Sequence, residues 1–246
     1  MHRLLVSIMT LIMVLADAAL QIVPDEIRAH PQIKQYAGRR GKLPEEVLLD
    51  RAFHHSAMKH LARTHPRISP EKMGRPDIVH NTLLQILETP LSWEQHLRVL
   101  VHTQDEQIIT INPKIRIPKN YTRFVGLIEQ LFKERIVPQD GEPLLTVERT
   151  TVQQIIRRMS PARTIGFSTL GRPELLRNVT NTAVGFKEPM IFIGAFPRGH
   201  FSENITQVLD EIYRVDSHSL NAWVVAGRFV YDYEWAIGLA QNRVNR

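Results

Sequence analysis

The stretch MIFIGAFPRGH, residues 190–200, decides the fold class. A short apolar strand (190–193) runs directly into a glycine-containing loop, and the spacing of apolar residues predicts a helix over 203–212. Strand, glycine loop and helix together are typical of an α/β ligand site, because glycines let the backbone approach a ligand beyond the carboxyl ends of the strands. The loop is neither GxGxxG nor Gly-Lys-Ser/Thr, which disfavours a phosphate cradle. A ligand made of an adenine, a ribose and an amino acid part remains open.

The sequence around this stretch continues the α/β pattern. Upstream, a helix is expected at about 151–159, a strand at 164–168 and a turn at 171–173. Downstream, a short strand (212–215) and a loop (216–220) precede a long apolar helix at about 221–239. There is no internal repeat and no low-complexity linker, so a single compact architecture is expected.

The composition excludes several classes of protein. Of the 246 residues, 43% are hydrophobic and 23% are charged, which excludes wholesale disorder, a collagen-like repeat and a coiled coil. The absence of cysteine excludes disulfide scaffolds, thiolate zinc sites, iron–sulfur clusters and cysteine nucleophiles. A net charge of +6 mildly favours a polyanionic partner, either nucleic acid or an anionic membrane.

The N-terminal region permits two readings. The uncharged run LLVSIMTLIMVLA (4–16) and the small-residue sequence ADA (16–18) have the form of a signal peptide with its cleavage site. The run is too short for a membrane span, which needs about 20 apolar residues. A buried β-strand has the same pattern, because fully buried parallel strands are also continuously apolar. Local sequence does not decide between the two.

A second informative stretch is GRPDIVH, residues 74–80. Proline fixes its own φ angle, so Arg75 and Asp77 are expected to project from a stiffened helix start. Asp77 could cap that helix, orient Arg75 or accept a proton. An earlier helix start is predicted at Pro44 from its proline and acidic first turn. The histidines that follow it (54, 55, 60 and 65) lack a metal-ligand spacing, and no metal site is expected.

The most distinctive electrostatic feature is PKIRIPKNYTR, residues 113–123. It follows a predicted β-hairpin (99–103 and 108–111) and carries four cations and no acidic residue. The next helix has an apolar stripe at Phe124, Leu127, Ile128, Leu131 and Phe132, which anchors the loop. Fixed arginines suit phosphate recognition, and Tyr121 is a candidate platform for base stacking. The alternative is a solvated surface loop.

Five segments together resemble the archaeal branch of the Nep1/Emg1 family: ADAALQIVP, GRPDIVH, INPKIRIPKNYTRF, FIGAFPRGH and SLNAW, in this order, from about residue 9 to residue 238. The resemblance implies a SPOUT-class methyltransferase that modifies pseudouridine at nitrogen-1 in small-subunit (16S-type) ribosomal RNA and takes part in ribosomal subunit assembly. It also implies a cytoplasmic homodimer that does not bind membranes. The N-terminal apolar run would then be the first core strand.

The resemblance further implies an α/β fold, a SPOUT-type sheet flanked by helices with a C-terminal trefoil knot. One domain would span 1–246, with a basic insertion and hairpin at about 95–135 and a knotted cofactor site at about 164–239. The implied methyl donor is S-adenosyl-L-methionine. The residues implied to bind it are Phe167, Gly194, Gly199, His200, Phe201, Val215, Asp216, Ser217, His218, Ser219 and Leu220.

The same resemblance assigns RNA contacts to Arg75, Arg116 and Arg123, while Lys119 replaces a fourth arginine and loses its bidentate geometry. Arg75 would also stabilise negative charge on the target ring, with Asp77 as its orienting partner, and no metal is required. Two alternatives stay open. One is a non-catalytic ribosome assembly factor that binds rRNA, and the other is a secreted α/β protein with a cleaved N-terminus.

Overall fold

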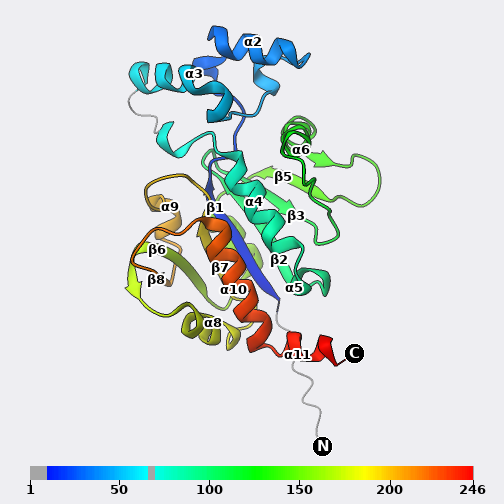
Figure 1. Ribbon diagram of the computed structural model, residues 1–246, viewed down its shortest axis with the longest axis vertical. Coiled ribbons are helices and arrows are strands. Elements are labelled where there is room, and N and C mark those ends of the chain that lie inside the picture. Colours follow the sequence, from blue (N-terminus) through cyan, green and yellow to red (C-terminus); the bar gives the residue numbers. More distant parts are fainter. Residues whose placement is uncertain (1–9, 66–69, 246) are drawn as a thin grey trace, which may run out of the picture.

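The computed structural model describes residues 10–65 and 70–245, and within them one eight-stranded sheet forms the centre of the fold (Figure 1). The strand order is β4-β5-β3-β2-β1-β7-β6-β8. The strands are β1 (Leu11–Ala18), β2 (Leu97–Thr103), β3 (Gln107–Ile111), β4 (Ile136–Val137), β5 (Leu145–Arg149), β6 (Thr164–Pro173), β7 (Met190–Gly194) and β8 (Glu211–Arg214). The α/β class predicted from the sequence is confirmed.

The central strand is β1, whose eight residues are all buried. It pairs in parallel with β2 on one side and β7 on the other. Burial on both faces explains its continuous apolar sequence. The strand reading of the N-terminal run is therefore confirmed for residues 11–16, while residues 4–9 of that run lie outside the described part of the chain.

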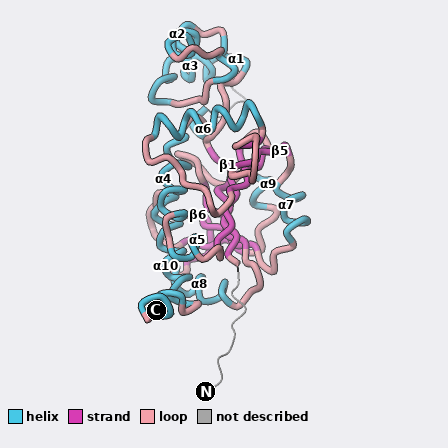
Figure 2. The backbone as a smooth tube through the Cα atoms, turned by 90° about the vertical axis from the view of Figure 1, so that its right-hand side faces the viewer, coloured by secondary structure: helices cyan, strands magenta, loops and turns pink. Residues whose placement is uncertain are grey.

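Helices cover both faces of the sheet (Figure 2). Helices α4, α6, α8 and α10 contribute buried residues to the larger core on one face, and α7 and α9 cover the other. The helices are α1 (Asp25–Arg28), α2 (Pro31–Arg39), α3 (Arg51–Thr64), α4 (Pro76–Leu87), α5 (Pro90–Trp93), α6 (Tyr121–Glu134), α7 (Val152–Met159), α8 (Leu176–Val184), α9 (Glu203–Thr206), α10 (Ala222–Ala236) and α11 (Leu239–Val244). None of those in the described residues is long and apolar enough to cross a membrane.

Helices α1, α2 and α3 form a small lobe, residues 24–65, beyond the carboxyl end of β1 (Figure 1). The lobe has its own apolar core. It is joined to α6 by the buried carboxylate of Glu129, which accepts hydrogen bonds from Arg40 at 2.6 and 2.7 Å, from Lys42 at 2.5 Å and from the backbone of Leu48 at 3.0 Å. These bonds satisfy a charge that would otherwise be costly to bury.

The hairpin, the amphipathic helix α6, helix α7 and the long C-terminal helix form where the sequence predicts them. Three predicted elements are wrong. The helix start at Pro44 is only a three-residue 3₁₀ turn (Pro44–Glu46), and α3 begins later, where Asp50 accepts the backbone N–H of Ala52 at 2.8 Å. The predicted turn at 171–173 lies within β6. The helix predicted over 203–212 ends at Thr206, and its last residues belong to β8.

Candidate functional site

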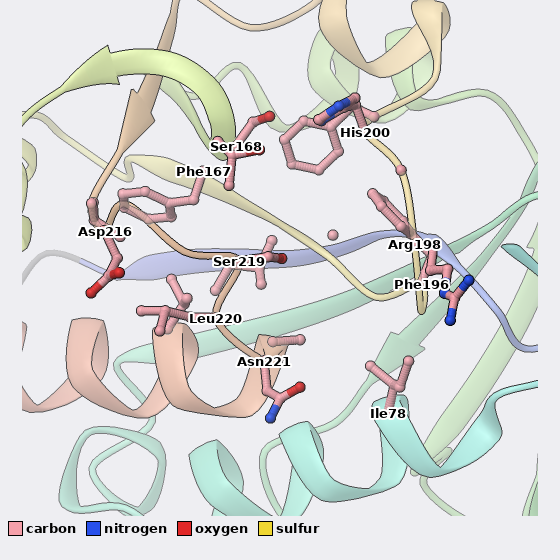
Figure 3. Close-up of a pocket in the computed structure, with 18 of the residues that line it drawn as sticks. Ile78, Phe167, Ser168, Phe196, Arg198, His200, Asp216, Ser219, Leu220 and Asn221 are labelled. Carbon is pink, nitrogen blue, oxygen red and sulfur yellow. The ribbon is translucent and has the colours of Figure 1, made fainter.

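A cavity of about 180 Å³ opens beyond the carboxyl ends of β7 and β8 (Figure 3). This is many times the space of about 15 Å³ that one water needs, so a small molecule fits. Figure 3 shows Asp216, Ser219 and Leu220 on the loop after β8, with Phe196, Arg198 and His200 on the glycine loop after β7. Parts of the chain far apart in sequence therefore share one pocket.

Ten of the eleven residues that the resemblance assigns to the cofactor line this cavity, and Ser217 does not. Arg75 and Ile78, from the start of α4, complete the wall. Several further residues line the cavity next to predicted ones, on loops that the sequence already indicates: Ser168, Thr169, Phe196, Pro197, Arg198, Asn221, Ala222 and Trp223. No signal in the sequence brought Ile78 to the site.

Two residues that sequence reasoning did not connect to the site hold the glycine loop. Asp17, buried at the end of β1, accepts hydrogen bonds from the backbone N–H of Ser202 at 2.6 Å and from its hydroxyl at 2.9 Å. Lys72 Nζ donates to the backbone carbonyl of His200 at 2.7 Å and lies 5.1 Å from the centre of the Phe196 ring. The loop is therefore preorganised before any ligand binds.

The turn before α4 brings Arg75 and Asp77 into a two-point ion pair. Arg75 Nε donates to Asp77 Oδ1 and a terminal nitrogen donates to Oδ2, both at 2.7 Å. These hydrogen bonds raise the pKa of Arg75 above its ordinary value, against the opposing effect of burial. Arg75 lines the cavity, whereas Asp77 does not. The Asp77 carboxylate therefore contacts the guanidinium of Arg75 and not the cavity itself.

Tyr121 points inward. Its hydroxyl donates to the buried carboxylate of Asp50 at 2.5 Å, and its ring centre lies 5.7 Å from that of His80. Burial, with the Asp50 carboxylate, raises the pKa of Tyr121. The hydroxyl of Tyr121 is therefore bound inside the protein while its ring is half-buried, and the base-stacking role stays a prediction.

The basic loop is anchored by alternate residues. Ile115 and Ile117 are buried, while Lys114, Arg116 and Lys119 are exposed. The backbone carbonyl of Pro118 also accepts a hydrogen bond from His80 Nε2 at 2.7 Å. The cations therefore stand on a fixed backbone that is attached to α4.

The loop's cations differ in their partners. Lys114 pairs with Glu142 at 2.7 Å and Lys119 with Glu88 at 3.3 Å, so acidic residues from elsewhere compensate part of the local charge. Arg116 and Arg123 are exposed and form no ion pair with any residue in 10–65 or 70–245. The RNA contacts expected of these two arginines stay a prediction. Within the same ranges, no three metal-ligating side chains gather.

Comparison with known proteins gives consistent matches along nearly the whole chain. A family model described as EMG1/NEP1 methyltransferase matches residues 13–234. The ribosomal RNA small subunit methyltransferase Nep1 of Pyrococcus furiosus is 37% identical over 225 residues, 92% of this chain and 96% of the relative. The protein of the same name from Staphylothermus marinus is 38% identical over 90% of this chain and 94% of its own.

A solved structure is similar as well. The crystal structure of Archaeoglobus fulgidus Nep1 bound to S-adenosylhomocysteine superposes with a TM-score of 0.81 at 34% identity. The match covers 94% of this chain and 100% of the other.

Proposed function

The chain belongs to the EMG1/NEP1 methyltransferase family, and on that premise we propose that it methylates small-subunit ribosomal RNA at nitrogen-1 of a pseudouridine, with S-adenosyl-L-methionine as methyl donor. The observation that carries the proposal is the shared cavity. The predicted cofactor loops and Arg75, one of the three arginines assigned to the RNA, line one pocket. A non-catalytic assembly factor, the alternative, would not need that juxtaposition.

The cavity suits such a donor. Gly199 lies in its wall with a φ of +92°, so the backbone there approaches the pocket without a side chain. Apolar residues such as Val215 and Leu220 alternate with polar Asp216 and Ser219 along the other wall, as a ligand with a base, a ribose and an amino acid part requires. The donor supplies an electrophilic sulfonium methyl group when it is bound.

The chain's own residues then have defined tasks. The target ring must lose the proton of its nitrogen, and negative charge develops on the ring as it does so. Arg75 places a cation at the pocket wall to stabilise that charge, and Asp77 holds the guanidinium in place. Both carboxylate oxygens of Asp77 already accept hydrogen bonds from Arg75, which favours orientation over proton abstraction.

Two measurements test the proposal. Calorimetric titration with S-adenosylhomocysteine should show binding at one site per chain. Incubation with labelled S-adenosylmethionine should methylate a short RNA hairpin that carries pseudouridine in its loop, and should leave the matching uridine hairpin unmodified. Absence of both signals would favour the assembly factor.

The finer architecture is also part of the proposal. We place the trefoil knot within residues 164–239 and treat 1–246 as one domain. This proposal is supported by the cavity, which three separate segments line together. They are the loop after β7, the loop after β8 and the turn at Arg75 that precedes α4. An rRNA substrate further implies action in the cytoplasm, and the intact mass of the protein isolated from its cells should then retain the first 17 residues.

We extend the proposal to a homodimer. Tyr231 and Trp235 on α10 are 56% and 48% exposed, with ring centres 6.3 Å apart, and an exposed aromatic pair of this kind is typical of an interface. Replacing both by serine should convert a dimer to a monomer in analytical ultracentrifugation, with secondary structure retained. A wild-type monomer at micromolar concentration would contradict this assignment.

The basic loop gives a quantitative prediction. Replacing Arg116 or Arg123 by alanine should weaken RNA binding and lower the slope of log affinity against log salt by about 0.7 to 1 each. Lys119→Ala should lower the affinity and the salt slope less, because Lys119 already pairs with Glu88. Affinity for S-adenosylhomocysteine should not change. If the variant with alanine at all three positions, Arg116, Lys119 and Arg123, kept the salt slope of wild type, the loop would be only a solvated surface.

A further inference from the structure

We propose that the outer face of α3 is a second RNA-binding surface, which holds the RNA strand that flanks the methylated loop. The proposal rests on the proposed function, since it assumes an RNA substrate at the cavity. The partner is recognised by its phosphodiester backbone and by one unstacked base.

The charge pattern of the helical lobe supports this surface. Residues 27–43 carry five Lys and Arg and no acidic residue, and residues 51–65 carry three and again no acidic residue. Over the whole lobe, residues 24–65, eight Lys and Arg stand against five Asp and Glu. Part of this charge is compensated, because Arg28 pairs with Asp25 and because Arg40 and Lys42 pair with Glu129 of α6. Lys59 and Arg63 of α3 form no ion pair with any residue in 10–65 or 70–245.

Basic side chains on the exposed side of α3 are arranged in a row. His55, Lys59 and Arg63 follow one another at intervals of four residues, so they lie along one side of the helix. All three are exposed, and they face away from the buried side of α3, which packs into the lobe core through Ala57, Met58 and Leu61. From His55 to Arg63 the row is about 12 Å long at about 1.5 Å per residue. Such a row can follow a strand backbone over successive phosphates.

An exposed aromatic ring stands two residues before the row on the same helix. Phe53 is 47% exposed, and one face of its ring packs on Tyr36 of α2 with a centre distance of 5.1 Å. The guanidinium of Arg40, held by Glu129, lies 5.4 Å from the centre of the Tyr36 ring and supports this aromatic pair from within the lobe. Cations interleaved with an open aromatic ring are the usual composition of a surface that binds single-stranded nucleic acid.

The position of the row connects it to the reaction site. The backbone N–H of Arg51, the first residue of α3, donates to the carbonyl of Gly74 at 2.9 Å, directly before Arg75. Asp50, which caps α3, also accepts the hydroxyl of Tyr121 at the end of the basic loop. The start of α3 is therefore bonded both to the turn that carries Arg75 and to the end of the basic loop, and α3 lies in the lobe above α4 in Figure 1. An RNA strand that leaves the cavity meets α3 next.

The test compares two RNAs: the minimal pseudouridine hairpin, and the same hairpin lengthened by single-stranded flanks on both sides. Wild type should bind the lengthened RNA more tightly. The double variant Lys59→Ala/Arg63→Ala should bind the lengthened RNA about three- to tenfold more weakly, with a salt slope smaller by about 1.4. Its affinity for the minimal hairpin, and its methylation rate on that hairpin at saturation, should match wild type.

Two further variants sharpen the result. The control variant Arg157→Ala/Lys187→Ala removes the same charge from exposed positions elsewhere. Its affinity for both RNAs should match that of wild type. Phe53→Leu keeps an apolar side chain but loses the ring. It should lower the affinity for the lengthened RNA by about fivefold or more. Three results would each overturn the proposal. The α3 variant could lose the same affinity for both RNAs, it could lose none, or the control variant could lose as much as the α3 variant. Failure of wild type to methylate the minimal hairpin would instead count against the proposed function.

Discussion

Arg75→Ala is expected to lower the methylation rate at saturating RNA and cofactor by about 10²- to 10³-fold, the loss typical for removal of one donor that stabilises developing charge. Arg75 lines the cavity, and no other described residue forms a two-point ion pair there. Arg75→Lys should recover only part of the rate, because an ammonium group lacks the fork that engages both oxygens of Asp77. Affinity for S-adenosylhomocysteine should change little in either variant.

Variants of Asp77 separate its two conceivable roles. If Asp77 orients Arg75, Asp77→Asn should retain one hydrogen bond and partial activity, roughly a tenfold loss, whereas Asp77→Gly should lose far more and also loosen the start of α4. If Asp77 were the general base, both variants should be equally inactive, and raising the pH should partly rescue both as the ring nitrogen ionises unaided.

Single-turnover methylation of the pseudouridine hairpin against pH decides between the roles. The structure favours orientation, because both oxygens of Asp77 are occupied by Arg75 at 2.7 Å. The pKa of Arg75 is raised, so its guanidinium stays charged as the pH increases and the orienting contact persists throughout the profile. Indistinguishable, pH-rescued rates for Asp77→Asn and Asp77→Gly would contradict this assignment.

Contacts between residues that are close together in the sequence could be predicted from it. Arg75 and Asp77 are two residues apart around a proline, so their ion pair depends on little beyond the turn itself. The apolar stripe of α6 likewise follows from its helical period, with Phe124, Ile128 and Leu131 buried.

Contacts between distant segments could not be predicted. Asp17 and Ser202 are 185 positions apart, and Tyr121 and Asp50 are 71 apart, so only the assembled fold brings each pair together. Nothing in a single sequence distinguishes Tyr121 as a buried donor from Tyr121 as an exposed ring.

The errors in secondary structure have the same origin. Residues 203–212 have a helical apolar period, yet Asp210 accepts hydrogen bonds from the backbone and hydroxyl of Thr164 at 2.8 and 2.9 Å, and the next residues pair with β6. Gly171 was expected in a turn, but a Cβ there would lie 2.6 Å from the backbone of Tyr213. The glycine therefore permits close approach of two strands, which local propensity cannot reveal.

The glycine loop after β7 offers the second large effect. Gly199→Val is expected to lower affinity for S-adenosylhomocysteine by about a hundredfold or more, about 3 kcal/mol. Gly199 has a φ of +92°, which branched residues rarely adopt, and a Cβ there would lie 3.0 Å from Cε of Lys72. The new side chain would thus displace Lys72 from the carbonyl of His200 and disturb the cavity wall.

Backbone strain alone must be separated from disturbance of the cavity, and Gly141 provides the matched control. Its φ is +89°, a Cβ added there would meet no atom within 4 Å beyond its chain neighbours, and it does not line the cavity. Gly141→Val should therefore lose a similar amount of folding stability, about 1–3 kcal/mol, while binding S-adenosylhomocysteine as wild type does. Calorimetric titration of both variants, with thermal unfolding measured alongside, gives the comparison. Equal cofactor affinity in folded Gly199→Val would place the cofactor elsewhere, and equal loss in both variants would show that strain, not the loop, is responsible.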